Sequence, residues 1–171
     1  QTDTSRKEFR TLKIDQAPKR FTLIHPLLLK DGNLLSHSYY APLFKIDFCS
    51  NLLWVNDEDK FHHSNQIDHE GNYWVPSVMY PHSKAISYYN KIYRFSDDAI
   101  TKIGPNGKIL FQKSVSEILL ENRIMKSHDI KSNDPIHLND IEPVFKDGPY
   151  WKRGDIFLSI RGLSSILHYR P

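Results

Sequence analysis

Three histidines open the same short sequence pattern. His25, His63 and His137 each begin an apolar-polar stretch that leads to a glycine turn and then to a strand-like segment. The glycines are Gly32, Gly71 and, after an insertion in the third copy, Gly154. Imidazoles can exchange protons near neutral pH, bind metals and act as nucleophiles. Repetition on this scale predicts one recurring structural unit in which the three histidines occupy equivalent places.

Asparagine follows two of these histidines at the same offset. Alignment of the copies on Leu29, Ile67 and Ile141 puts the histidines in register, and Asn65 and Asn139 then lie two residues after His63 and His137. Side chains alternate along a strand, so each histidine is predicted to point to the same side as its asparagine. By the same alternation His62 points to the opposite side from His63, unless a bulge reverses it. For His25, which has Pro26 beside it and no matching asparagine, we expect a structural role.

Arg161 is predicted to join this group. It follows Leu158-Ser-Ile in the strand after the third copy, and the start of a strand lies level with the end of its antiparallel neighbour. Arg161 should therefore approach His137 and Asn139. A metal would suit the imidazoles, but the arginine and the lack of a carboxylate or thiolate in register favour an anion such as sulfate, phosphate or carboxylate. We therefore predict neither a metal nor a cofactor.

The elements that must position these residues are mostly strands. Short apolar and aromatic runs separated by Pro, Asn, Asp and Gly are typical of antiparallel β-structure, and Asn106-Gly107 is a strong hairpin signal. The predicted strands are 33–40, 42–47, 52–56, 73–79, 100–104, 108–113, 136–144, 155–160 and 165–169. One helix is predicted at about 115–122, because Ser114 and Glu117 have the spacing of a capping box.

Four antiparallel strands per unit indicate an all-β fold of the β-propeller type. The blades are predicted at about 22–56, 61–113 and 136–171, the third with only three strands. Residues 1–171 would thus form part of a propeller, as a fragment of a longer protein, and 9–14 would be an outer strand of a preceding blade. Uncovered blade faces would favour association with another copy.

Composition excludes several classes of protein. The net charge of +3 comes from 23 basic and 20 acidic residues, which are scattered and so argue against a nucleic-acid partner. No apolar run reaches the roughly 18 residues of a membrane helix. The single cysteine, Cys49, excludes an internal disulfide and a cysteine-rich metal site. The chain starts without a signal peptide and without Met.

The motifs resemble those of bacterial aryl-sulfate sulfotransferases. The resemblance rests on His137-Leu-Asn-Asp with the downstream Ser-Ile-Arg161, and on Phe61-His-His-Ser-Asn with Asp-His-Glu-Gly-Asn-Tyr-Trp. It implies a six-bladed, periplasmic or secreted propeller that moves a sulfuryl group from an aryl sulfate to a phenol without a nucleotide donor, by a ping-pong route through a sulfated histidine. It also implies that His137, Asn139 and Arg161 are pocket residues and that one histidine of the His62-His63 pair has a similar role, with register favouring His63.

The resemblance also implies that the sulfated histidine lies in a later blade, so the isolated chain is predicted to be inactive. His168 is the one histidine after Arg161, but it falls on a third strand rather than at the head of a first strand. Two other functions remain open from the residues alone. One is a non-catalytic propeller that binds a ligand or a protein. The other is a metal-dependent hydrolase or lyase, which would carry stoichiometric metal.

Overall fold

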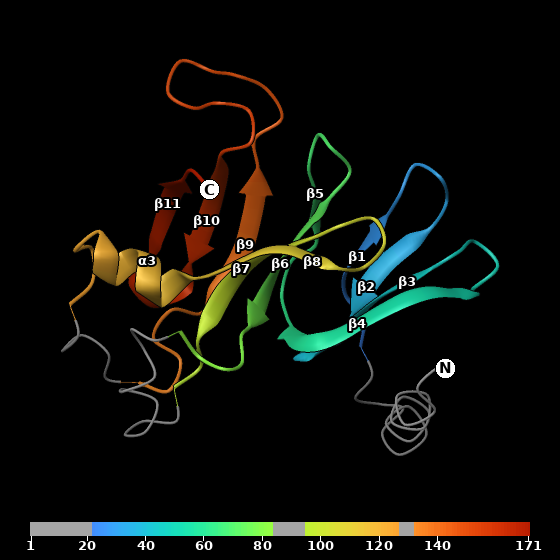
Figure 1. Cartoon of the computed structure of the whole chain (residues 1–171), viewed down its shortest axis with the longest axis horizontal. Coiled ribbons are helices and arrows are strands. Elements are labelled where there is room, and N and C mark those ends of the chain that lie inside the picture. Colours follow the sequence, from blue (N-terminus) through green and yellow to red (C-terminus); the bar gives the residue numbers. More distant parts are fainter. Residues whose placement is uncertain (1–21, 84–94, 127–131) are drawn as a thin grey trace.

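The computed structural model describes residues 22–83, 95–126 and 132–171, and these residues form antiparallel β-structure (Figure 1). The strands are β1 (Ile24–Leu28), β2 (Leu34–His37), β3 (Ala41–Ile46), β4 (Leu52–Phe61), β5 (Gln66–Ile67), β6 (Tyr73–Val78), β7 (Asp98–Ile103), β8 (Ile109–Ser114), β9 (Leu138–Pro143), β10 (Ile156–Ile160) and β11 (Ser165–Tyr169). The all-β prediction is confirmed. The predicted strand 9–14 lies outside the described residues, and so does most of 80–96, an insertion between the predicted strands 73–79 and 100–104.

The strands pair as three consecutive meanders. The first meander is β1 to β4, the second is β5 to β8 and the third is β9 to β11, with antiparallel neighbours throughout. The end of β4 also pairs with the end of β6, which joins the first two meanders into one eight-stranded sheet. The third meander is a separate three-stranded sheet. β4 is longer than the predicted 52–56 because it continues into this second pairing.

The glycine turns of the repeat adopt one conformation. Gly32, Gly71 and Gly154 have φ of 79°, 84° and 92°, a region that a side chain disfavours. In the first two turns the glycine N–H donates to the carbonyl three residues earlier, at 3.0 Å and 3.1 Å. Figure 1 shows the three loops on the same, upper side of the molecule. The first strands of the meanders therefore run in the same direction and begin at the opposite side.

The Asn106-Gly107 hairpin turn packs against the first meander. The Trp54 indole N–H donates to the Pro105 carbonyl at 2.9 Å, and the Asn56 amide donates to the Gly107 carbonyl at 2.8 Å. A Cβ on Gly107 would lie 2.7 Å from the Trp54 ring. The glycine is thus required for the close approach as well as for its φ of 84°.

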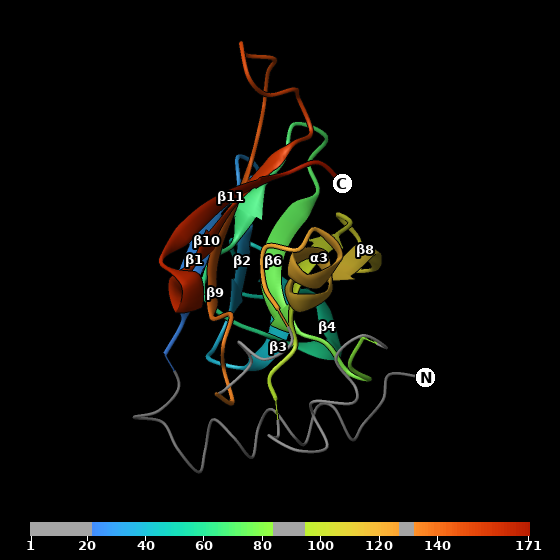
Figure 2. The same ribbon diagram turned by 90° about the vertical axis from the view of Figure 1, so that its left-hand side faces the viewer.

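The predicted helix is α3 (Val115–Glu121). The Ser114 hydroxyl accepts the Glu117 N–H at 3.1 Å and so caps the helix. Val115, Ile118 and Leu119 are buried against the third meander in one apolar cluster that also contains Leu138 and Leu158. α3 follows β8 directly and contacts β7 and β8, and Figure 2 shows it on the same side of the molecule as β8. The helix therefore fills the space between the second and third meanders and helps to fix the position of β9.

A second apolar cluster lies between the first and second meanders. Its fully buried members are Leu35, Leu43, Phe61, Val75 and Ile103. Burying side chains of this size stabilises the fold by roughly 1.5–3 kcal/mol each. In the described part of the chain, no helix has the length and apolar character needed to cross a membrane.

Candidate functional site

The three repeated histidines share an unusual backbone conformation. His25, His63 and His137 have φ of 40°, 59° and 50°, in the left-handed region that few non-glycine residues occupy. A residue in this conformation does not follow the alternation of a pleated strand. The predicted alternation is therefore wrong at these positions, and the rings of His62 and His63 lie on the same side, with their centroids 5.1 Å apart.

The histidines of the second and third copies meet. The ring centroids of His63 and His137 are 5.0 Å apart, so His62, His63 and His137 form a continuous line that we call the histidine row. Two tyrosines flank it: Tyr40 lies 5.1 Å from His62 and Tyr39 lies 5.7 Å from His63, centroid to centroid. His63 is thus the member of the His62-His63 pair that contacts His137, as the register favours.

Arg161 lies where the sequence predicts. Its backbone N–H donates to the His137 carbonyl at 3.1 Å, and its side-chain Nη1 is 3.3 Å from Nε2 and 3.5 Å from Nδ1 of His137. Nearly equal distances to both nitrogens mean that the guanidinium lies against the ring rather than in line with one lone pair. Arg161 is exposed, and in the described ranges no carboxylate pairs with it. Its donors are therefore available to an anion.

A carboxylate that the sequence analysis missed holds the His137 ring. Asp134 Oδ2 is 2.5 Å from His137 Nδ1. An imidazole beside a carboxylate carries its proton on the facing nitrogen, so Nδ1 donates to Asp134 and Nε2 keeps its lone pair in the neutral ring. The search for a carboxylate in register with the histidines did not find Asp134, because Asp134 precedes the repeat. The sequence did contain a signal for this contact, since Asp134 lies three residues before His137.

The two asparagines do not join the histidine row. Asn65 donates from its amide to the His25 carbonyl at 2.8 Å and to the Ile24 carbonyl at 3.3 Å, so it links the second meander to the first. Asn139 is half-buried and lies at an irregularity of the β9–β10 ladder, with no hydrogen bond from its side chain to the described residues. The irregularity also breaks the predicted alternation, since Leu138 and Ile141 are both buried in one cluster.

Burial keeps the imidazoles of His63 and His37 neutral. Desolvation, with smaller effects from His62 and His137, lowers the pKa of His63 to about 4. Burial likewise lowers the pKa of His37 to about 4, although its Nδ1 donates to the Ser38 carbonyl at 2.9 Å. At pH 7 both rings are neutral, and Nε2 of each is buried without a hydrogen-bond partner among the described residues. A neutral imidazole can accept a proton or offer a lone pair.

These low pKa values predict that acid destabilises the protein. An unfolded histidine has a pKa near 6.5, so between about pH 6.5 and 4 the unfolded chain binds more protons at His37 than the folded chain. The histidine contribution to stability is complete above pH 6.5 and is lost as the pH falls toward 4. Urea unfolding across this range should give a flatter pH dependence for His37→Gln than for the wild type.

Comparing the pH dependence of stability between variants separates the effect of His37 from that of other titrating groups. Burial raises the pKa of Asp59 and of Asp97, and raised carboxylate pKa values act in the opposite direction. The matched control is His69→Gln, at an exposed turn position. A His37→Gln profile parallel to those of the control and the wild type would contradict the prediction.

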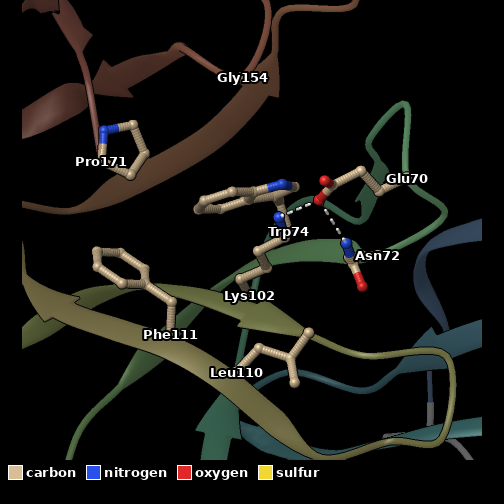
Figure 3. A pocket seen from close by; sticks show the side chains of 8 residues that line it. All are labelled: Glu70, Asn72, Trp74, Lys102, Leu110, Phe111, Gly154 and Pro171. Carbon is tan, nitrogen blue, oxygen red and sulfur yellow. Dashed lines mark hydrogen bonds and ion pairs between the residues drawn. The ribbon is translucent and has the colours of Figure 1, made fainter.

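A separate hollow lies between the second and third meanders (Figure 3). It has a volume of about 350 Å³ and is lined by Trp74, Phe111 and Leu110, with the Lys102–Glu70 ion pair of 3.0 Å at its edge. None of its lining residues belongs to the histidine row. In the described part of the chain, no group of three or more His, Cys, Asp or Glu side chains is placed to hold a metal ion.

A family model described as Arylsulfotransferase (ASST) matches residues 25–171, from the first repeated histidine through Arg161 and β11. The chain belongs to this arylsulfotransferase family. Membership implies a sulfotransferase that acts on small aryl substrates. No curated protein matches the chain.

Proposed function

We propose that this arylsulfotransferase moves a sulfuryl group from a phenolic sulfate ester to another phenol, without a nucleotide sulfate donor. The convergence of His63, His137 and Arg161 carries the proposal. Aryl sulfate is a monoanion with three sulfuryl oxygens, and the exposed guanidinium beside two imidazoles offers donors for them. The tyrosines at the row, Tyr39 and Tyr40, provide aromatic surface next to the anion site.

The proposed reaction has two half-reactions through a sulfohistidine. A neutral imidazole nitrogen bonds to sulfur, the bond from sulfur to the aryl oxygen breaks, and the phenolate leaves with the electron pair and takes a proton. In the second half-reaction a phenol oxygen bonds to sulfur, the nitrogen–sulfur bond breaks, and the phenol proton returns to the protein. By family resemblance, we assign the sulfated histidine to a part of the protein that follows residue 171.

The described residues then have distinct roles. Arg161 stabilises the charge on the sulfuryl oxygens in the transition state. His137 is oriented by Asp134 through Nδ1 and has the Arg161 guanidinium against its ring, so its Nε2 lone pair can exchange a proton with the aryl oxygen of a substrate bound at Arg161. His63 is neutral at pH 7 because burial lowers its pKa to about 4, so it can accept a proton beside His137.

We further propose that the three meanders are blades of a six-bladed propeller in a periplasmic or secreted protein. The support is geometric: the meanders repeat one strand order, their glycine turns lie on one side, and each begins with a left-handed histidine. A propeller collects the starts of its innermost strands at one mouth of a central channel. Histidines from successive blades would therefore face a common pocket.

The protein expressed from its complete reading frame tests the function. With an aryl sulfate donor and no nucleotide, we expect release of the donor phenol that depends on an acceptor phenol, and a sulfuryl adduct on histidine in the donor-only reaction. Residues 1–171 alone should give no turnover. Folded full-length protein that releases no phenol above background would refute the enzymatic proposal and favour a binding role.

A further inference from the structure

A second carboxylate reaches the histidine row from the second meander. Asp98 is the first residue of β7, and its side chain is 1% exposed. Its Oδ2 accepts the backbone N–H of Leu138 at 2.7 Å. Burying a carboxylate is costly unless it is hydrogen-bonded or paired, so this contact is part of what keeps Asp98 in place. Because Leu138 directly follows His137, Asp98 also fixes the start of β9.

The other oxygen of Asp98 faces His62. Oδ1 is 3.5 Å from His62 Nε2, and both side chains are 1% exposed. Neither nitrogen of His62 has a hydrogen-bond partner in the described residues, and neither does Oδ1 of Asp98. A carboxylate oxygen that faces an imidazole nitrogen favours the tautomer with the proton on that nitrogen, which here is Nε2. Nδ1 of His62 is then left with its lone pair.

The arrangement repeats, on the other side of His63, the contact between Asp134 and His137. The ring of His63 lies 5.1 Å from His62 and 5.0 Å from His137, so a carboxylate–imidazole pair stands on each side of it. The charge of Asp98 also acts on His63, whose pKa it raises against the larger lowering by burial. Asp98 is therefore coupled to all three members of the histidine row.

We propose that Asp98 is a positioning residue that holds His62 in the Nε2–H tautomer and fixes the start of the strand that carries His137. Its effect on turnover rests on the proposed sulfuryl transfer, whereas the tautomer and the strand contact do not. Asp98 touches no substrate in this scheme and acts through the two histidines.

The tautomer can be measured directly. In protein labelled with ¹⁵N in histidine, long-range proton–nitrogen correlation distinguishes protonated from bare ring nitrogens. In the wild type at pH 7 we expect Nε2 of His62 to carry the proton and Nδ1 to be bare, with His62→Gln identifying the signals. A wild-type His62 protonated on Nδ1 would overturn the proposal without any further variant.

The variant Asp98→Asn tests whether the Asp98 carboxylate sets the tautomer of His62. Asparagine has the same shape, and its oxygen can still accept the Leu138 N–H, but its amide then donates to His62 Nε2. We expect His62 to move its proton to Nδ1 and kcat of the full-length protein to fall by about tenfold or more, with little change in KM. The control is Asp97→Asn, at a neighbouring carboxylate that is also buried but bonds to Ser114 at 2.5 Å and to the Ser83 N–H at 2.7 Å.

The outcomes separate this inference from the proposed function. If Asp97→Asn and Asp98→Asn leave the His62 tautomer equally unchanged, Asp98 does not position His62 and the inference is wrong. A tautomer switch in Asp98→Asn with unchanged kcat refutes its influence on turnover. If the wild type lacks sulfotransferase activity yet shows the switch, the proposed function fails while the positioning role of Asp98 stands.

Discussion

Arg161→Ala is expected to lower kcat/KM for an aryl sulfate donor by about a hundredfold in the full-length protein. Donors that stabilise developing charge contribute about 10²–10³ in rate elsewhere. Arg161 is suited to this role because its guanidinium lies 3.3 Å from His137 Nε2 and pairs with no carboxylate among the described residues. Steady-state kinetics with a chromogenic donor would measure the effect, which should fall mainly on kcat.

Two further variants make the Arg161 prediction specific. Arg161→Lys keeps the charge but loses the planar fork of donors, so its activity should lie between those of the wild type and Arg161→Ala. Arg170→Ala is the matched control, because the Arg170 guanidinium is bound to Asp155 at 2.7 Å and lies outside the histidine row. Equal activities of Arg161→Ala and Arg170→Ala would exclude Arg161 from the site.

Gly162→Ala is expected to destabilise the protein by at least about 2 kcal/mol, in the range of overpacked cores. A Cβ on Gly162 would lie 1.9 Å from the Pro135 carbonyl oxygen and 2.8 Å from that of Ile136. Both contacts are with backbone, so no side chain can move aside. Relief requires separating Arg161 from the segment that carries His137. Urea unfolding should therefore show a lower midpoint, and turnover should fall with it.

Two other glycines give the comparison. Gly71 and Gly154 have φ of 84° and 92°, but nothing lies within 4 Å of an added Cβ. Alanine there should cost roughly 1–2 kcal/mol, from the backbone conformation alone. If Gly162→Ala were no more destabilising than Gly71→Ala and Gly154→Ala, the close approach of the two segments would be contradicted.

Most of the strand pattern could be predicted because its signals are local. Period-two alternation, Asn106-Gly107 and the capping serine at Ser114 each act within a few residues, and the strands and α3 lie close to the predicted ranges. The continuation of β4 to Phe61 could not be predicted, since Phe61 pairs with Ala41 of β3 beyond an irregularity of that ladder and with Ser77 of the later strand β6. Which strands pair across units is a property of tertiary packing.

The candidate site could be predicted only in part, for the same reason. The approach of Arg161 to His137 could be predicted from the sequence, because antiparallel register places the end of one strand beside the start of its neighbour. The directions of the histidine rings could not be predicted in this way. Side chains alternate only along an extended backbone, and His63 has a φ of 59°. Asp98 and Asp134 were missed since they come from outside the repeat. Asn65 fits the repeat but binds backbone of the first meander, so register alone does not identify a functional residue.

The left-handed histidines have a consequence for how such a protein can change. Because the ring direction at positions 25, 63 and 137 depends on the local backbone turn, it is independent of the apolar pattern that builds the sheets. Asparagine, aspartate and glycine also tolerate this conformation, whereas valine and isoleucine do not. The residue type at positions 25, 63 and 137 can thus vary within this small set while the sheets stay intact. Of the three histidines, His25 is exposed and without ring contacts to the described residues, so exchanging its side chain removes the fewest contacts.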